Sequence, residues 1–187
     1  MILFKTNRRR AAIYIDGNNT YFKLKDLNLR NLTNFNYRKL ADWLAGNREV
    51  ISYRYYIGKI HTADDNLKGQ ELRKNQQRLF AHLQSQGQGF IIKEGRLMEN
   101  GGRYHEKGVD VKLAVDLVVG AFDDLYDDAI IISSDTDLIP AIKKVKHLKK
   151  KVEYIGFSHK PSLGIQKNVS RSRLLTLEEL KNFEISD

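Results

Sequence analysis

The amino-acid sequence predicts an α/β fold with three layers, in which helices cover both faces of a central, mainly parallel sheet of about five strands. Short apolar segments rich in β-branched residues, typical of buried strands, alternate with longer segments whose apolar residues have helical spacing. This alternation favours parallel strands joined by helical crossovers. A chain of 187 residues is long enough for one domain with its own core.

Five segments have the composition of buried strands. In chain order they are Ala11–Ile15, Val50–Ile57, Gly89–Lys93, Ala129–Ile132 and Val152–Ile155. Helical spacing predicts helices over Tyr37–Ala45, Gly69–Gln86 and Val109–Phe122, and another from about Asp137 with Pro140 in its first turn, where proline is tolerated. We expect the last part of the chain to be extended over Leu174–Leu177 and helical over Glu178–Lys181.

Two segments have less regular patterns. The glycine-rich segment Glu94–Gly108 predicts a long loop or a hairpin. The segment Val109–Phe122 is apolar almost all round, with one stripe at Val111, Val115, Val118 and Phe122 and another at Ala114, Leu117 and Ala121. A helix of this kind is expected to pack on more than one side.

Composition limits the classes of protein to consider. We find no repeat or linker, and expect one domain over residues 11–180, between a basic extension at 1–10 and a tail at 181–187. Its 32 Lys and Arg against 23 Asp and Glu give a net charge of +9, which favours polyanions such as nucleic acid. The absence of cysteine excludes disulfides and thiolate zinc sites. No segment has the length of a signal peptide or membrane span, so we expect a cytoplasmic protein without a membrane partner.

Carboxylates follow two of the predicted strands. Asp16 comes directly after the first strand, Asp135 and Asp137 come after the fourth, and Asp110 begins the apolar helix. Ligands of open parallel sheets bind at the carboxyl ends of the strands, so we expect these acids to converge there. Converging carboxylates repel one another, and hard cations that prefer oxygen ligands, such as Mg²⁺ or Mn²⁺, offset that repulsion. The sequence therefore predicts a metal site, to which neutral oxygens or donors are added by Asn18, Asn19, Ser134 and Thr136.

Each acid also has an ordinary structural explanation. A lone Asp135 or Asp137 is most often a helix N-cap, Asp16 with the following glycine is a common turn pair, and Asp110 suits the first turn of a helix. Their coincidence at one edge of the sheet favours the metal site. A cation held there can bridge a phosphate and lower the pKa of bound water, as phosphodiester hydrolysis requires.

Asp116 has a less certain role than the other acids. It lies six residues after Asp110, about 9 Å along the helix and roughly 120° round it. This position leaves three hypotheses open: a deeper metal ligand, a residue that supports the ligands, or an ion-pair partner of Lys112.

Three segments in this order carry a family resemblance: IYIDGNN, KGVDVKLAVDLVVGAF and AIIISSDTDLIPAI. They resemble the NYN domain family, PIN-like nucleases that include the LabA-like proteins, and the similarity runs from about Ala11 to Ile155. The resemblance implies a PIN-like fold and metal-dependent ribonuclease activity. By position it implies metal ligands at Asp16, Asp110, Asp135 and Asp137, an acidic position at Asp116, and the amide after the first aspartate at Asn18.

We therefore predict a metal-dependent ribonuclease, an endoribonuclease that uses Mg²⁺ or Mn²⁺ and leaves 5′-phosphate and 3′-hydroxyl ends, as the resemblance implies. Its substrate is RNA, single-stranded or structured. The alternative is a non-catalytic RNA-binding or protein-interaction module with a PIN-like fold, which would hold RNA in the presence of a chelator and never cut it. A homodimer is compatible with either hypothesis, and the sequence does not identify the RNA target.

Several side chains are candidates for contact with RNA. Basic residues near the predicted site would hold phosphates without recognising sequence, although a run of charges is more often a solvated surface. They are Arg96, Arg103 and Lys107, in the segment that leads into Asp110, and Lys143 in a lysine cluster. His105 is a weaker candidate for an acid or base. Tyr53, Tyr55 and Tyr56 have rings that can stack on bases, but their strand pattern favours packing for at least two of them.

Other phosphate chemistries lack their motifs. The absence of GxxxxGK[ST] argues against a P-loop NTPase, and without a strand-linked GxGxxG a dinucleotide-binding enzyme has no support. Phosphatases of the haloacid dehalogenase type carry Asp-x-Asp after the first strand, whereas here Asp135 and Asp137 follow the fourth. Toprim domains also carry this pair, but begin from a glutamate where this chain has Asp16.

Overall fold

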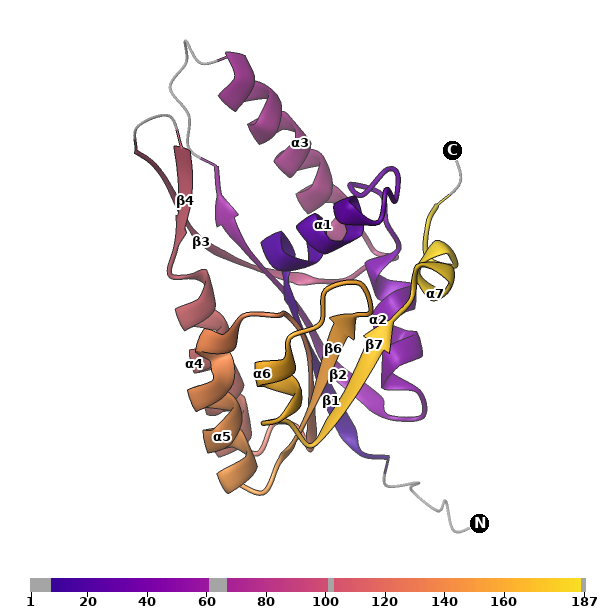
Figure 1. The fold of residues 1–187 in the computed structure, drawn as a ribbon, viewed down its shortest axis with the longest axis vertical. Coiled ribbons are helices and arrows are strands. Elements are labelled where there is room, and N and C mark those ends of the chain that lie inside the picture. Colours follow the sequence, from indigo (N-terminus) through magenta and orange to yellow (C-terminus); the bar gives the residue numbers. More distant parts are fainter. Residues whose placement is uncertain (1–7, 61–66, 101–102, 186–187) are drawn as a thin grey trace.

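A single seven-stranded sheet forms the centre of the molecule in a computed structural model that describes residues 8–60, 67–100 and 103–185 (Figure 1). The strand order is β4-β3-β2-β1-β5-β6-β7. All neighbouring strands are parallel except β3 and β4, which form an antiparallel pair. The strands are β1 (Arg10–Asp16), β2 (Glu49–Lys59), β3 (Ile91–Asn100), β4 (Arg103–Lys107), β5 (Asp128–Ile132), β6 (Lys151–Phe157) and β7 (Arg171–Leu175).

Helices cover both faces of this sheet, so the predicted three-layer α/β architecture is confirmed. One face packs against the first three helices and the C-terminal one, and the other face packs against the helices that follow β4 and β5. The helices are α1 (Gly17–Asp26), α2 (Tyr37–Ala45), α3 (Leu67–Gln84), α4 (Val109–Phe122), α5 (Ile139–His147), α6 (Leu163–Gln166) and α7 (Leu177–Lys181), with a 3-10 turn, η1 (Thr136–Leu138), before α5.

The mainly parallel sheet is confirmed, but it has seven strands rather than about five. The two additional strands, β4 and β7, lie at the edges of the sheet. An edge strand can be exposed to solvent on one face or both, so its sequence need not be a continuous run of apolar residues. In β7, Arg171 and Ser172 are exposed and only Leu175 is fully buried. The predicted loop or hairpin over Glu94–Gly108 is a hairpin, made by the second half of β3 with β4.

The core has two parts, one on each side of the sheet. Successive side chains of a strand point to opposite faces, so in β1 Ile13 and Ile15 pack under α1, α2 and α3, while Tyr14 packs under α4. The same alternation divides β5, whose five residues are all buried. Buried strands of this kind read as continuous apolar runs, which is why β1 and β5 were detectable in the sequence.

Helix α4 departs from its predicted packing. Leu113, Leu117 and Ala121 are buried, and Ala114 and Val118 pack partly, so two sides of the helix are covered. The predicted stripe that begins at Val111 is mostly exposed, however, with Val111 at 65% and Phe122 at 76%. The chain alone therefore leaves an apolar surface on this helix.

Two further expectations concern the ends of the chain and the tyrosines. Residues 1–7 of the expected basic extension lie outside the described residues, and Arg10 already belongs to β1. Tyr55 and Tyr56 are fully buried, so the expectation that at least two tyrosines of this strand are packing residues is confirmed. Within the described ranges, no helix combines the length and apolar character needed to cross a membrane.

Candidate metal centre

Strands β1 and β5 bring two of the predicted acids to one edge of the sheet. The strands are parallel neighbours, and Ile15 pairs with Ile132 at their carboxyl ends. Asp16 is therefore the last residue of β1, and Asp135 follows β5 by three residues. Both acids also cap helices: Asp16 accepts from the Asn19 backbone N–H at the start of α1, and Asp135 accepts from that of Asp137 in η1. The cap interpretation and the metal interpretation thus apply to the same side chains.

Ser133 connects the two acids. Its hydroxyl donates to Asp16 Oδ2 at 2.8 Å and accepts the backbone N–H of Asp135 at 3.1 Å. Asn19 adds a second connection, because its backbone N–H donates to Asp16 Oδ1 at 3.1 Å and its side-chain oxygen accepts from the Ser134 backbone. Ser133 was not singled out from the sequence. The feature that could have indicated it is its position as the first polar residue after the apolar strand β5.

Gly17 allows the first helix to begin against the sheet. A Cβ at this position would lie 2.3 Å from the ring of Tyr55 and 2.8 Å from the carbonyl oxygen of Tyr56. Because the second contact is with backbone, it cannot be relieved by a side-chain movement. The Asp16–Gly17 pair therefore serves a close approach of α1 to β2, and this approach holds Asp16 at the edge of the sheet.

Burial and neighbouring charge act on Asp16 in the same direction. The residue is only 8% exposed, and this desolvation raises the pKa of its carboxyl to about 6. The hydrogen bonds from Ser133 and Asn19 lower that pKa, while the negative charges of Asp110 and Asp135 raise it. Asp16 thus accepts two hydrogen bonds and has no ion-pair partner among the residues that the structure describes.

Asp110 approaches this edge from the first turn of α4. Burial raises the pKa of its carboxyl, and the negative charges of Asp135 and Asp137 raise it further. The structure therefore brings Asp110 within electrostatic range of the other three predicted acids, and Asp16 within range of Asp110 and Asp135. Within the part of the chain that is described, none of the four forms an ion pair with a lysine or arginine.

The remaining predicted polar residues lie around these acids. Thr136 and Asp137 are exposed in η1, and Asn18 is partly buried in the first turn of α1. The Ser134 hydroxyl lies 3.4 Å from that of Tyr154, facing β6 rather than Asp16. Ser134 therefore contributes to this edge mainly through its backbone N–H.

Asp116 has partners of its own. Its carboxylate pairs with Arg54 at 3.1 Å and Lys93 at 3.6 Å, and accepts from the Tyr56 hydroxyl at 2.8 Å. It is absent from the charges that raise the pKa values of Asp16 and Asp110. Of the three hypotheses for this residue, the ion pair fits best, with partners on β2 and β3 in place of the expected Lys112.

A family model of the NYN domain matches residues 10–172 of the chain. The chain belongs to the NYN domain family. NYN domains are PIN-like and are generally nucleases, which gives the acidic edge its chemical context.

Comparison with solved structures supports the same fold for this NYN domain. A crystal structure of a protein of unknown function from Vibrio parahaemolyticus matches it with a TM-score of 0.67, covering 94% of this chain and 97% of that one. The two sequences are 20% identical, so the likeness shows a shared fold and carries nothing about activity. No significant match was found among curated proteins.

Two of the four predicted RNA contacts lie beside the acids of this NYN domain. Arg96 and Lys107 are cross-strand partners in the β3–β4 hairpin, both are exposed, and Lys107 precedes Asp110 by three residues. Arg103 is near the tip of β4, and the side chains of 97–106, including His105, lie outside what the structure describes. Lys143 is exposed on α5.

Two glycines fix this hairpin to α4. Gly95 is packed so closely that a Cβ would lie 2.3 Å from Val109 Cγ2 and 2.9 Å from the Lys107 carbonyl oxygen. Gly108 adopts a φ of +78° immediately before the helix, a conformation that other residues rarely take. Together they place a basic strand end next to an acidic helix start.

The donors at this edge fit a hard divalent cation, since all are carboxylate, hydroxyl or amide oxygens. In the described structure, however, these donors lie farther apart than the ligands of a bound metal ion do. Among the residues described, no three acidic or histidine side chains lie close enough together to hold an ion. The fit therefore rests on the chemistry of the donors and on the uncompensated burial of Asp16.

Proposed function

We propose that this NYN domain is a metal-dependent endoribonuclease, in which Asp16, Asp110, Asp135 and Asp137 hold Mg²⁺ or Mn²⁺. One observation carries the proposal: the charge of Asp110 interacts with those of Asp16, Asp135 and Asp137, none of these four acids has an ion-pair partner among the described residues, and burial raises the pKa of Asp16 to about 6. A protein rarely keeps such a cluster without something that offsets the repulsion.

Each part of the edge has a role in this proposal. When bound, the cation supplies positive charge that polarises a phosphodiester and the attacking water. Asp16 is oriented by its bonds from Ser133 and Asn19, and Asp110 and Asp135 complete the negative edge. Arg96 and Lys107, with Arg103 and Lys143 further out, hold backbone phosphates. Asp116 is left out of the metal set because Arg54 and Lys93 already neutralise it.

The test is cleavage of single-stranded RNA by purified protein with Mg²⁺ or Mn²⁺, beside an EDTA lane and the variant Asp135→Asn. Asp123→Asn is the matched control, because Asp123 is exposed at the far end of α4 and forms no ion pair among the described residues. We expect cleavage in the wild type and the control, and a loss greater than about 100-fold in Asp135→Asn, since even residues that only orient metal ligands contribute 10–100-fold.

A direct measurement of metal binding separates chemistry from occupancy. Mn²⁺ should raise the melting temperature of the wild type and of Asp123→Asn, and leave Asp135→Asn nearly unchanged, because a ligand that binds only the native state stabilises it. Equal shifts in all three proteins would place the metal elsewhere.

One observation favours the alternative of a non-catalytic binding module: the described acids do not form a ready metal shell. That module predicts RNA that binds equally in EDTA and in Mn²⁺ and stays intact in every lane. Such a result would remove the nuclease proposal and leave the acids as helix caps.

A further inference from the structure

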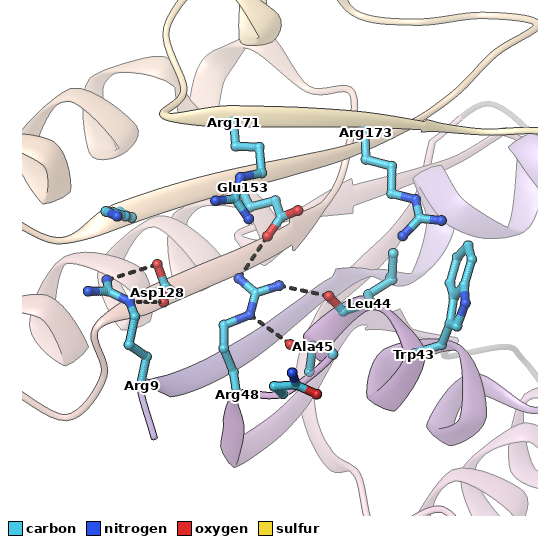
Figure 2. A pocket seen from close by; sticks show the side chains of 12 residues that line it. Arg9, Trp43, Leu44, Ala45, Arg48, Asp128, Glu153, Arg171 and Arg173 are labelled. Atoms are coloured by element: carbon cyan, nitrogen blue, oxygen red, sulfur yellow. Dashed lines mark hydrogen bonds and ion pairs between the residues drawn. The ribbon is translucent and has the colours of Figure 1, made fainter. Parts of the chain in front are cut away.

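A second polar surface lies at the opposite edge of the sheet, away from the four acids. It is an open cleft of about 440 Å³ between the end of α2 and the first residues of β5, β6 and β7 (Figure 2). Strand β1 runs for seven residues between the two edges, which separates them by roughly 20 Å. We call this surface the amino-edge cleft; its lining residues are Arg9, Trp43, Leu44, Ala45, Gly46, Asn47, Arg48, Asp128, Lys151, Glu153, Arg171 and Arg173.

Strand register explains why charged side chains meet in this cleft. Asp128 pairs with Lys151 across β5 and β6, and Glu153 pairs with Arg171 across β6 and β7. Cross-strand partners point to the same face of a sheet, here the face that carries α2. Because α2 ends at Ala45, it does not extend over these strand beginnings. The floor of the cleft is therefore polar, and none of the described helices covers it.

Two arginines of the cleft are held by its two carboxylates. Arg9 binds Asp128 through two hydrogen bonds, at 2.6 and 3.0 Å. Arg48 lies 2.7 Å from Glu153 and also donates to the carbonyl oxygens of Leu44 and Ala45, which close the end of α2. Both carboxylates of the cleft are thus neutralised by these two residues.

The other cations of the cleft keep unused charge. Lys151 and Arg171 are exposed, and neither forms an ion pair or a hydrogen bond from its side chain within the described part of the chain. Arg173 pairs with Glu179 at 3.0 Å and lies over the Trp43 ring, 3.7 Å from its centre. Five cations against two carboxylates leave the lining strongly positive.

We propose that the amino-edge cleft binds a phosphate monoester, either a free nucleotide or the terminal phosphate of a nucleic-acid strand. A guanidinium offers paired donors that match a phosphate, and an ammonium adds a point charge. Lys151 and Arg171 supply both from neighbouring strands, and a dianion matches their two charges. The volume lies within the range of small-ligand sites, so the turn Ala45–Asn47 leaves room for the organic part. This site is independent of the proposed nuclease function.

Tryptophan fluorescence can report the binding of a ligand in the amino-edge cleft. Trp43 is the only tryptophan of the chain, and it lines the cleft beneath Arg173. Uridine monophosphate is titrated into the full chain in EDTA, with binding measured by calorimetry and by tryptophan fluorescence. We expect saturable binding with a fluorescence change, and no comparable binding of uridine, which lacks the phosphate.

Variants locate the binding. The double variant Lys151→Gln, Arg171→Gln should bind uridine monophosphate at least tenfold more weakly than the wild type does. The matched control is Lys74→Gln with Arg78→Gln, which removes the same charge from exposed positions on α3 and should bind as the wild type does. Equal affinity of the two double variants, or calorimetric binding without a response of Trp43, would place the ligand outside the cleft and overturn the proposal.

A short RNA with and without a 5′-phosphate, tested in EDTA, distinguishes the two sources of the monoester. Stronger binding of the phosphorylated RNA than of uridine monophosphate supports a strand end, and the reverse supports a free nucleotide. Equal binding of both RNAs, lost in Lys151→Gln with Arg171→Gln, would show that internal phosphodiesters occupy the cleft and would refute a monoester site. All arms are run in EDTA and need no cleavage, so the outcome is separate from that of the nuclease test.

Discussion

At the amino ends of β1 and β5, Asp127 and Asp128 each lie against an arginine. At the carboxyl ends of the same strands, Asp16 and Asp135 lie near one another, and no described lysine or arginine forms an ion pair with either. The hydrogen bond from Arg10 lowers the pKa of Asp127 to about 2, and burial raises the pKa of Asp16 to about 6. The carboxylates of the amino edge are neutralised within the chain, and those of the carboxyl edge are left without a described ion-pair partner.

This comparison indicates that the charges that stabilise the fold lie at one edge of the sheet, and the charges that serve function lie at the other. Paired charges at the amino edge hold strand beginnings and the end of α2 in place, so they stabilise the native state. Unpaired carboxylates at the carboxyl edge destabilise it, and they persist where a ligand can offset their charge. Substitutions of the same chemical kind should therefore have opposite consequences at the two edges.

The largest expected effect is on the amino edge, in Arg48→Met. This change leaves the nearly buried Glu153 carboxylate without its partner and removes two donors to the end of α2, so the free energy of unfolding should fall by about 3–5 kcal/mol. Urea unfolding measures it. Arg171→Met is the control in the same cleft, and should stay within about 0.5 kcal/mol of the wild type. A loss of similar size in both variants would contradict the distinction between engaged and unused cations.

The second effect is a gain of stability in Asp16→Asn without metal. A carboxyl with a raised folded-state pKa destabilises the protein when it is ionised, and a shift from 3.8 to about 6 corresponds to about 3 kcal/mol. The amide oxygen of the variant would still accept the cap bond from Asn19. In EDTA, the variant should be more stable than the wild type above pH 6, and the difference should vanish below about pH 4. Chemical unfolding at pH 8 and pH 4 measures both, and a less stable variant at pH 8 would refute the electrostatic account.

Ser133→Ala should have a smaller effect, seen in activity. The hydroxyl orients Asp16 and the backbone of Asp135, and residues that orient metal ligands contribute about 10–100-fold to affinity or rate. We expect the Mn²⁺ concentration for half-maximal RNA cleavage to rise, with the fold unchanged. Ser85→Ala, at an exposed hydroxyl after α3, is the control. An unchanged metal requirement would show that Ser133 has only a structural part.

The smallest effect is expected in Asp127→Asn. This carboxyl is partly exposed, so its ion pair with Arg10 contributes no more than about 1 kcal/mol. A lowered folded-state pKa stabilises the protein above the unfolded value near 3.9, and this contribution is lost as the pH falls through about 2. The variant should therefore be slightly less stable than the wild type at pH 7 and equal to it near pH 2. A variant more stable than the wild type at pH 7 would refute the claim that the charge of Asp127, unlike that of Asp16, stabilises the protein.

Helix α4 shows how far the sequence could go in predicting the site. Asp110 lies near Asp16 at the carboxyl edge, as its place in the sequence predicted, although the strand before α4 is the antiparallel β4. The β3–β4 hairpin extends beyond the end of β2 and returns to it at Lys107, so α4 begins at that edge. The role of Asp116 could not be predicted, since its partners Arg54 and Lys93 come from β2 and β3, and which side of α4 faces those strands depends on packing. Ser133 and Asn19 belong to the same class: their residue types were visible, but their bonds join distant segments.

The fold shows a similar division. The central strands β1, β5 and β6 were predictable because burial on both faces demands continuous apolar runs, and α2 because its period is regular. The edge strands β4 and β7 were not counted, since an edge strand needs no such run. Trp43 on α2 is 38% exposed beneath Arg173, a contact between distant segments that helical spacing does not predict.

The sequence by itself therefore established the α/β alternation, the acids at strand ends and the motifs of the NYN family. These features depend only on the order and spacing of residues along the chain. Packing in three dimensions established which charges are neutralised. The amino-edge cleft joins Arg9 to Asp128, and the ion pair of Asp116 joins α4 to β2 and β3, so the partners come from segments that are far apart in the chain. Charge compensation depends on distances through space, and one-dimensional spacing does not encode them.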